Sequence, residues 1–222
     1  MLERLHHFNP LKWPKTSIIG LAGIITYCMF TLLSFSFFPS TFNPINNNIS
    51  ELGDFYDNPN GAIFYNVGMV LTGLASILFY LGLYKCFMIR KKSNLDVFAL
   101  GAGIINALAI MMAGVFSETQ ETYSQHVFWS ILIFASFFPV LILVNTSVFT
   151  RPDFTNLVAY YGFGVSLIDL SFLVLLFITG VDANYSLMEW FAVFSYISWI
   201  GVLAVSIIRS GVPVTNNKFE AN

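Results

Sequence analysis

The stretch VFWSILIFASFFPVLILVNTSV, residues 127–148, contains no charged side chain. A helix needs about 20 consecutive apolar residues to cross the hydrocarbon of a bilayer, and this stretch has that length. Five further runs of similar composition occupy residues 17–38, 62–84, 97–116, 158–181 and 190–208, with Asp169 as their only charged residue. The pattern predicts an all-α, polytopic integral membrane protein with six transmembrane helices.

The composition supports the same fold class. Hydrophobic residues make up 56% of the 222 residues and charged residues only 10%, whereas soluble domains have roughly 25% charged residues. Six spans take up nearly the whole chain, so we expect a single membrane domain over residues 1–222, in contact with membrane lipids. A net charge of −2 argues against nucleic acid as a partner.

All basic residues fall on one side of this six-helix arrangement. Positive charge close to helix ends marks the cytoplasmic side of a membrane protein. We therefore expect a multi-pass protein of the cell membrane with both termini in the cytoplasm. The ten basic residues are Arg4, Lys12, Lys15, Lys85, Arg90, Lys91, Lys92, Arg151, Arg209 and Lys218.

Seven of the twelve acidic residues gather on the opposite, outer side. No Lys or Arg is available there, so these carboxyls must be hydrated, protonated, paired with His126 or bound to a cation. The outer side is therefore where we expect a functional site. The seven residues are Glu51, Asp54, Asp57, Glu118, Glu121, Asp182 and Glu189.

The first outer loop, residues 39–61, is longer than an ordinary connection. It contains the stretch NISELG, residues 48–53, in which Asn48 can cap a helical turn and Gly53 can end it in the left-handed conformation. We expect a short helical lid over the bundle, with Ile49 and Leu52 pointing inward and Ser50 and Glu51 at or near the polar surface. A capped loop that covers no ligand is the alternative interpretation.

Several short motifs resemble those of a known family. They are Asn43-Pro44, Ile49-Ser50-x-Leu52-Gly53, Asn66 with Gly68, Gly114-x-Phe116-x-Glu118, and His126. In these motifs the chain resembles the six-helix membrane proteins of the domain-of-unknown-function 998 family. The resemblance covers most of the chain and implies the fold and a set of candidate positions, but no substrate.

Three candidate site residues lie at outer helix ends: Glu118 ends the third span, His126 begins the fourth and Glu189 begins the sixth. Two carboxyls and an imidazole suffice for general acid–base catalysis, or for a divalent metal held by three ligands with one open position. Ser50 or a bound water is the candidate nucleophile. The alternative is a structural role as caps, since the helix dipole alone stabilises a carboxylate such as Glu189 by roughly 0.3–1 kcal/mol.

Three further polar residues are expected to contact a ligand. Asn48 and Glu51 belong to the lid, and Asn66 lies about one turn inside the second span. The cofactor is otherwise unknown.

Asp169 lies about midway along the fifth span, where an acidic side chain costs roughly 2.5–3.5 kcal/mol. It must face inward, and we expect a partner from Asn106 at similar depth, from Ser166 or Ser171, or from a bound cation. Asp169 then acts either as a proton or cation relay or as a neutral side chain that holds two helices together.

Three functions are compatible with this sequence. An outer-facing pocket under the lid would bind or process a lipid head group or small polar ligand, which requires the candidate catalytic residues to converge around one cavity. A non-enzymatic subunit would dock a partner membrane protein through an exposed apolar patch on the outer loop. A small ion-coupled transporter would need a polar path past Asp169. The oligomeric state is left open by the sequence.

Overall fold

The structure, a computed structural model, describes residues 13–90, 93–180 and 184–210. Within these residues every regular element is helical and no strand occurs. All six α-helices are long and apolar enough to cross a membrane, which confirms the predicted spans. The elements in chain order are α2 (Lys15–Ser36), the 3₁₀ helix η2 (Ile49–Gly53), α3 (Ala62–Arg90), α4 (Asn94–Val115), α5 (Tyr123–Phe149), α6 (Asn156–Thr179) and α7 (Ser186–Arg209).

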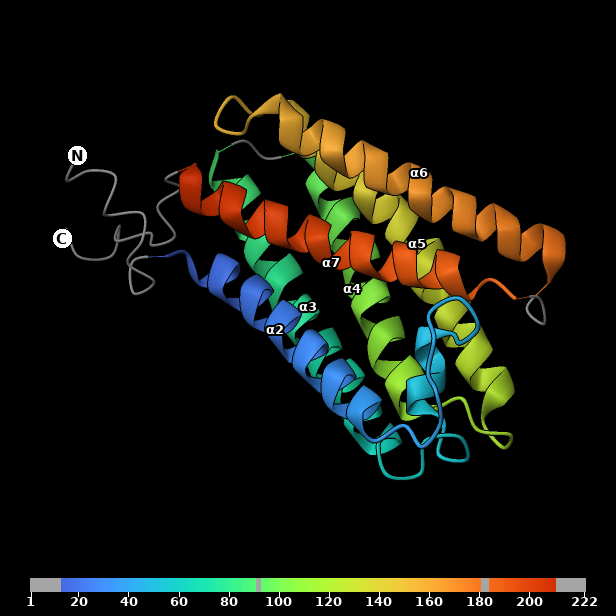
Figure 1. Ribbon diagram of the computed structural model, residues 1–222. Helices are drawn as coiled ribbons and strands as arrows, with labels where there is room; N and C mark the ends of the chain where they lie inside the picture. Colours follow the sequence, from blue (N-terminus) through green and yellow to red (C-terminus); the bar gives the residue numbers. More distant parts are fainter. Residues whose placement is uncertain (1–12, 91–92, 181–183, 211–222) are drawn as a thin grey trace.

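The six long helices form a closed ring (Figure 1). Each packs against its neighbours in the sequence, and the ring closes where α7 packs against α2. The start of α2 and the end of α7 lie at the same end of the bundle (Figure 1). We term this the basic end, and the opposite end, which holds η2, the site end.

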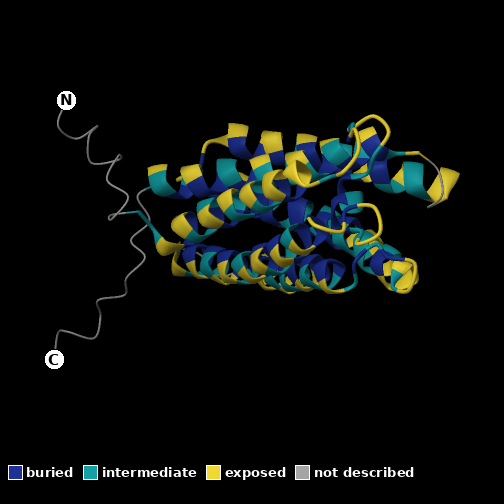
Figure 2. Ribbon diagram, turned by 60° about the horizontal axis from the view of Figure 1, so that its bottom comes forward, coloured by how far each residue is buried: buried dark blue, intermediate teal, exposed yellow. Residues whose placement is uncertain are grey.

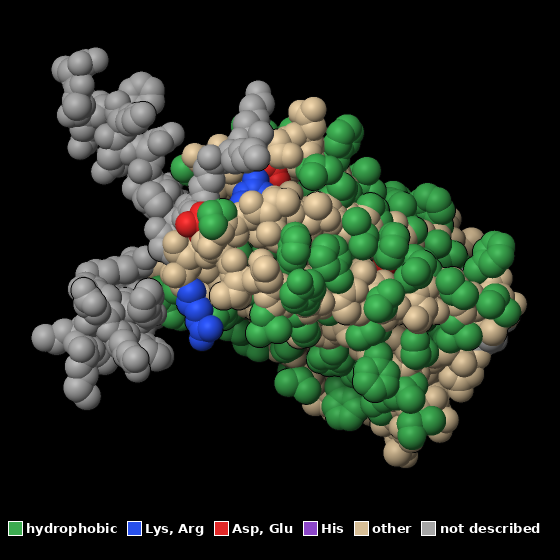
Figure 3. All heavy atoms as spheres, turned by 90° about the horizontal axis from the view of Figure 1, so that it is seen from above, with side chains coloured by type: hydrophobic (Ala, Val, Ile, Leu, Met, Phe, Trp, Pro, Cys, Tyr) green, Lys and Arg blue, Asp and Glu red, His purple; other side chains and the backbone are tan. Residues whose placement is uncertain are grey.

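The surface separates charge from apolar side chains in the way that a bilayer requires. Figure 3 shows Lys and Arg side chains near the basic end, while hydrophobic side chains cover much of the remaining visible face. Figure 2 shows the buried residues facing the inside of the ring and the exposed ones facing outward. Lipid tails are as apolar as leucine. Apolar side chains on the exterior are therefore stable against the hydrocarbon of a bilayer.

Glycines let α3 and α4 approach closely. A Cβ atom at Gly103 would lie 2.7 Å from Cγ of Tyr80, and one at Gly73 would lie 2.7 Å from the backbone oxygen of Ala107. Ala99, Gly103 and Ala107 are all buried on α4, at the spacing of four residues seen in the sequence. Close contact of this kind is what holds helices together in lipid.

Aromatic side chains fill the centre of the ring. The Phe137 ring on α5 packs edge-on against Tyr196 and Trp199 of α7, with centroid distances of 4.4 and 5.6 Å. The indole N–H of Trp199 donates to Oδ1 of Asn145 at 3.2 Å. The core therefore ties α5 to α7 across the ring and satisfies the buried indole donor.

A buried ion pair lies at the basic end. Nη2 of Arg151 donates to Oδ2 of Asp96 at 2.6 Å, and Oγ of Ser147 donates to Oδ1 of Asp96 at 2.7 Å. The guanidinium also lies 4.2 Å from the ring centre of Phe87. From the sequence Arg151 is only a marker of topology; in the structure it also fastens the end of α5 to α4.

Three of the partners expected for Asp169, the side chains of Asn106, Ser166 and Ser171, bond elsewhere, while the bound cation expected as an alternative stays a prediction. Nδ2 of Asn106 donates to the backbone oxygen of Ile133, and the hydroxyls of Ser166 and Ser171 donate to backbone oxygens of their own helix. Both carboxyl oxygens of Asp169 are buried without a hydrogen-bond partner among the described residues. The reason is that Ser in a helix readily bonds a carbonyl of the preceding turn, while Asn106 bonds to α5.

Candidate functional site

The helix η2 closes the site end of the ring, where the sequence predicts a lid. It packs against α2, α3 and α7. Ile49 and Leu52 point inward and are buried, in a cluster with Tyr27 of α2 and Tyr65 of α3. Burial of these apolar side chains fixes which face of η2 points down, so Ser50 faces the interior of the ring below it.

Two asparagines bind the lid to the helices. Nδ2 of Asn58 donates to the backbone oxygen of Leu52 at 2.9 Å and to Oγ of Ser34 at 2.9 Å. Nδ2 of Asn66 donates to the backbone oxygen of Gly53 at 2.9 Å. Asn66, expected as a ligand contact, therefore holds the lid on α3. Asn58 was missed by sequence reasoning, because nothing in the sequence distinguishes it from the other asparagines of the loop.

Gly53 ends η2 without adopting the left-handed conformation. Among the described residues only Gly180 has a positive φ, so this expectation for Gly53 is wrong. Close packing requires the glycine instead: a Cβ atom at Gly53 would lie 2.5 Å from Oδ1 of Asn66 and 2.9 Å from Cδ1 of Tyr65. The lid could not sit this close to α3 with a larger residue.

Glu51 and Asn48 stabilise the turn of the lid itself. Oε1 of Glu51 accepts from the backbone N–H of Asn48 at 2.8 Å, and Oε2 accepts from Nδ2 of Asn47 at 2.7 Å. Such a bond from the third residue of a helix back to its cap is half of a capping box. Neither Asn48 nor Glu51 lines the cavities beneath the lid, and their contact with a ligand stays a prediction.

A cavity of about 70 Å³ lies inside the ring beneath the lid, and one of about 30 Å³ lies beside it, between α5, α6 and α7. We term the combined space the site pocket. It has room for several water molecules, each of which needs roughly 10–15 Å³. The two cavities share Ser50, His126, Ser130, Phe134 and Glu189, and Glu118 lines the smaller one. The four residues predicted to be catalytic therefore meet around one space, although their roles stay a prediction.

His126 is oriented by two backbone carbonyls. Its Nδ1 lies 2.8 Å from the oxygen of Phe116 and 3.3 Å from that of Ala113, at the end of α4. A carbonyl oxygen only accepts, so Nδ1 carries a proton, and in the neutral ring the lone pair lies on Nε2. Nε2 lies 3.2 Å from Oγ of Ser130 and 4.0 Å from Oε2 of Glu118. His126 thus presents a proton acceptor to the pocket.

Glu118 lies between α4 and α5, with its side chain only 16% exposed. Its Oε2 has no hydrogen-bond partner among the described residues. Burial raises the pKa of Glu118 to about 7, a hydrogen bond from Ser50 opposes that shift, and the nearby carboxyl of Glu51 adds to it. Near neutral pH this carboxyl therefore exists in both protonation states and can either donate or accept a proton.

Glu189, in the first turn of α7, contacts the lid directly. Its Oε2 accepts from the backbone N–H of Ile49 at 3.0 Å. Ser50, Glu118 and Glu189 line the smaller cavity together. The lid therefore brings one hydroxyl to the pocket that holds both carboxyls.

The arrangement suits proton transfer better than metal binding. Among the described residues, no three His, Cys, Asp or Glu side chains gather closely enough to hold a metal ion. Glu118, His126 and Glu189, the candidate ligands for a divalent metal, line one pocket without forming a three-ligand site. The imidazole of His126 contacts two backbone carbonyls and Ser130 rather than Ser50, so water near His126 is a better candidate nucleophile than Ser50.

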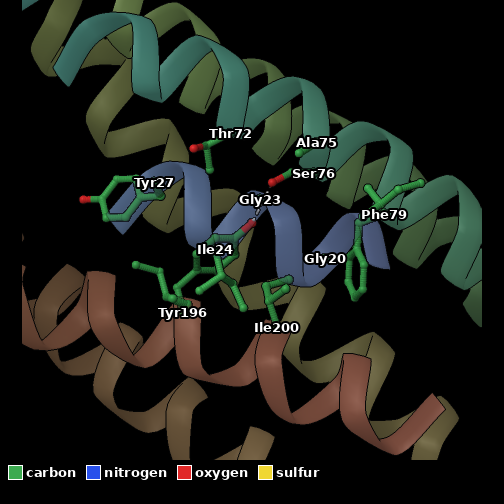
Figure 4. A pocket seen from close by; sticks show the side chains of 12 residues that line it. Gly20, Gly23, Ile24, Tyr27, Thr72, Ala75, Ser76, Phe79, Tyr196 and Ile200 are labelled. Atoms are coloured by element: carbon green, nitrogen blue, oxygen red, sulfur yellow. Dashed lines mark hydrogen bonds between the residues drawn. The ribbon is translucent and has the colours of Figure 1, made fainter. Parts of the chain in front are cut away.

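The deep side of the site pocket adjoins a narrow cavity of about 20 Å³ between α2, α3 and α7 (Figure 4). The two spaces share Tyr27, Thr72, Tyr196 and Ile197. Oγ of Ser76 lies 3.5 Å from the hydroxyl of Tyr196 in this region. Away from the lid, the titratable groups give way to apolar side chains and a few hydroxyls.

Comparison with known proteins supports the motif resemblance. The sequence profile of the family described as "Protein of unknown function (DUF998)" matches residues 21–206. No curated protein and no solved structure matches the chain. The matched range runs from the first turns of α2 almost to the end of α7 and contains the lid and all four pocket residues discussed above. The chain belongs to the DUF998 family.

Proposed function

We propose that the protein binds the polar head of a lipid, or another small polar ligand, in the site pocket, and that His126 and Glu118 exchange protons with it. The observation that carries this proposal is the convergence of Ser50, Glu118, His126 and Glu189 on one pocket. These residues come from four separate parts of the chain. A cavity with a few convergent polar groups at its wall is the usual form of a ligand site.

The contacts of each residue suggest its role. His126 is the proton acceptor, because carbonyl contacts at Nδ1 leave the Nε2 lone pair facing the pocket. Glu118 is the proton donor near neutral pH, because burial raises its pKa to about 7. Glu189 positions the lid through the backbone N–H of Ile49, and Ser50 brings a hydroxyl to the pocket. The buried face of the lid keeps bulk water away, which strengthens electrostatic contacts inside.

We also propose that the site end faces the outside of the cell and that both chain ends are cytoplasmic. The support comes from the basic residues, of which Lys15, Lys85, Arg151 and Arg209 lie at the opposite end of the described helices. Positive charge at helix ends favours the cytoplasmic side.

Native mass spectrometry of the protein purified in a mild detergent tests the proposed function. We expect an added mass on the wild-type protein that is lost in His126→Ala and in Glu118→Gln. The matched control is Glu121→Gln, because Glu121 lies in the same connection but bonds to Tyr56 at the surface, outside the pocket. Absence of any added mass on the wild-type protein, or its retention in both pocket variants, would contradict the proposal.

A second candidate function is docking of a partner membrane protein. The observation that favours it is the exposure of Phe55 and Tyr56 on the loop that carries the lid. Under this alternative, Phe55→Ser with Tyr56→Ser would abolish co-purification of a partner, and Glu118→Gln would leave it unchanged. Transport through Asp169 gains less support, because Asp169 does not line the site pocket.

A further inference from the structure

The wall of the site pocket carries acidic groups and an imidazole but no permanent positive charge. Its titratable groups other than tyrosines are Glu118, His126 and Glu189, and no Lys or Arg lines it. At pH 8, above the pKa of about 7 of Glu118, a phosphate or carboxylate head would face an ionised carboxyl, and like charges in a site of low dielectric repel strongly. An ammonium head would be attracted to the same groups. The charge of the wall therefore favours a cationic ligand.

Hydrogen-bonding capacity in the pocket points to the same head group. Oε2 of Glu118 is buried and accepts no hydrogen bond from the described residues. Oε2 of Glu189 accepts one bond from the lid, which leaves a carboxylate oxygen with further lone pairs. An ammonium carries three donors and no acceptor, and leaving water is favourable for it only when carboxylates take up those donors. The pocket supplies acceptors of this kind.

Beyond these groups the pocket is apolar and continues along α3 to an unpartnered hydroxyl. Oγ1 of Thr72 has no hydrogen-bond partner among the described residues, although Thr72 is only 8% exposed. Thr72 lines the site pocket and also the narrow cavity beyond it, which Figure 4 shows. It lies seven residues after Tyr65, which also lines the site pocket, a rise of roughly 10 Å along a helix. The lining on this side includes Met69, Ile110 and Val193, so a ligand that fills the pocket needs an apolar body behind its head.

The smaller cavity opens toward the lipid-facing side of the helices. Its lining includes Tyr123 and Ile131, which are exposed on α5, together with Leu176 of α6. Beyond Leu176 the last turn of α6 has Phe177 and Ile178 exposed. The lid covers the end of the ring, whereas the side of the smaller cavity next to α5 and α6 faces the bilayer. A molecule dissolved in the membrane therefore has the more direct route to the pocket.

We propose that the ligand of the site pocket is an amphiphile from the bilayer, with a protonated primary amine as its head and an apolar tail of roughly 10 Å. The amine binds between Glu118 and Glu189 under Ser50, and the tail lies against the apolar wall toward Thr72. This assignment rests on the proposed function of the pocket and specifies its ligand class.

Four probe molecules that differ in head group or in tail test this assignment. Octylamine has the head and the tail, octanol has the tail without charge, methylamine has the head without the tail, and octyl phosphate has the tail with an anionic head. Each is added to the purified protein in a nonionic detergent at pH 8, at equal mole fraction, and the thermal unfolding midpoint is followed. We expect octylamine to raise the midpoint with an apparent Kd at least tenfold lower than that of octanol, and the other two to leave it unchanged.

Variants test whether the preference for octylamine over the other probes arises in the site pocket. Glu118→Gln should weaken the binding of octylamine at least tenfold and change the binding of octanol less than twofold, because only the amine needs the carboxylate. Glu121→Gln should behave as the wild-type protein. Equal effects of octylamine and octanol, or stronger binding of octyl phosphate, would overturn the amine assignment and leave the pocket as a lipid site. No effect of any probe would overturn the proposed function as well.

Discussion

The two ends of the bundle treat buried acidic side chains in opposite ways. At the basic end, Asp96 is held by Arg151 and Ser147 through bonds of 2.6 and 2.7 Å. At the site end, Glu118 is buried with an oxygen that no described residue contacts by a hydrogen bond. The same fold thus pairs one carboxyl fully and leaves another open. Unpaired groups of this kind concentrate at functional sites, where a ligand completes them.

The largest expected effect comes from breaking the paired end. Arg151→Ala leaves Asp96 buried without its cation, which should lower the free energy of unfolding by about 3–5 kcal/mol. Thermal unfolding of the purified protein in detergent measures the loss. The double variant Asp96→Leu with Arg151→Met removes both charges and should recover most of the stability. If Arg151→Ala unfolds at the wild-type midpoint, the ion pair contributes nothing to folding.

Glu118→Gln should raise the free energy of unfolding, whereas Arg151→Ala lowers it. The reason is that the charged form of the buried Glu118 carboxyl is unfavourable. The pKa of Glu118 is about 7 in the folded protein, above its ordinary value of 4.5. The folded state therefore holds the proton more tightly, and the stability that this gives is complete below pH 4.5 and is lost as the pH rises through 7. The difference between these two pKa values corresponds to on the order of 3 kcal/mol of unfolding free energy.

Since glutamine does not ionise, the Glu118→Gln variant should be more stable than the wild-type protein by on the order of 3 kcal/mol at pH 8.5 and nearly equal to it at pH 4.5. Unfolding midpoints of both proteins across this range give the measurement. Glu121→Gln serves as the control, since Glu121 is exposed and its hydrogen bond from Tyr56 lowers its pKa. A pH-independent difference between Glu118→Gln and wild type would show that burial does not perturb this carboxyl.

Gly53→Ala tests whether the lid holds the site end closed. The added Cβ would lie 2.5 Å from Oδ1 of Asn66, so the lid must shift, at a typical overpacking cost of about 1–3 kcal/mol. Gly101→Ala is the matched control, because a Cβ there meets nothing within 4 Å. That variant should be neutral or slightly stabilising. Equal midpoints for the two variants would mean that the lid is not packed on α3 as described.

The transmembrane helices could be predicted because each depends on a local property, an uncharged run of about 20 residues. Positions at helix ends likewise suggested that Glu118, His126 and Glu189 face one side. Other features depend on contacts between distant segments and leave no local signal. Asn58 reaches back to Ser34 of α2, and Thr72 is distinctive only because no described group meets its hydroxyl. The burial of Arg151 likewise depends on distant partners, Asp96 of α4 and Phe87 of α3.

The smallest expected effect concerns Asp169, a third buried carboxyl, which is unpaired like Glu118 but lies outside the site pocket. It is as buried as Asp96, yet neither of its oxygens has a hydrogen-bond partner among the described residues, and it lines no part of the site pocket. Replacing an unsatisfied buried group by an apolar one of similar size removes a desolvation cost. Asp169→Leu should therefore raise the unfolding free energy, by about 1 kcal/mol, and leave octylamine binding unchanged. A destabilised variant, rescued by Asp169→Asn, would instead indicate a native hydrogen-bond partner. A loss that asparagine cannot rescue would indicate a bound cation, and Asp169 would then be a second unpaired carboxyl that a ligand completes.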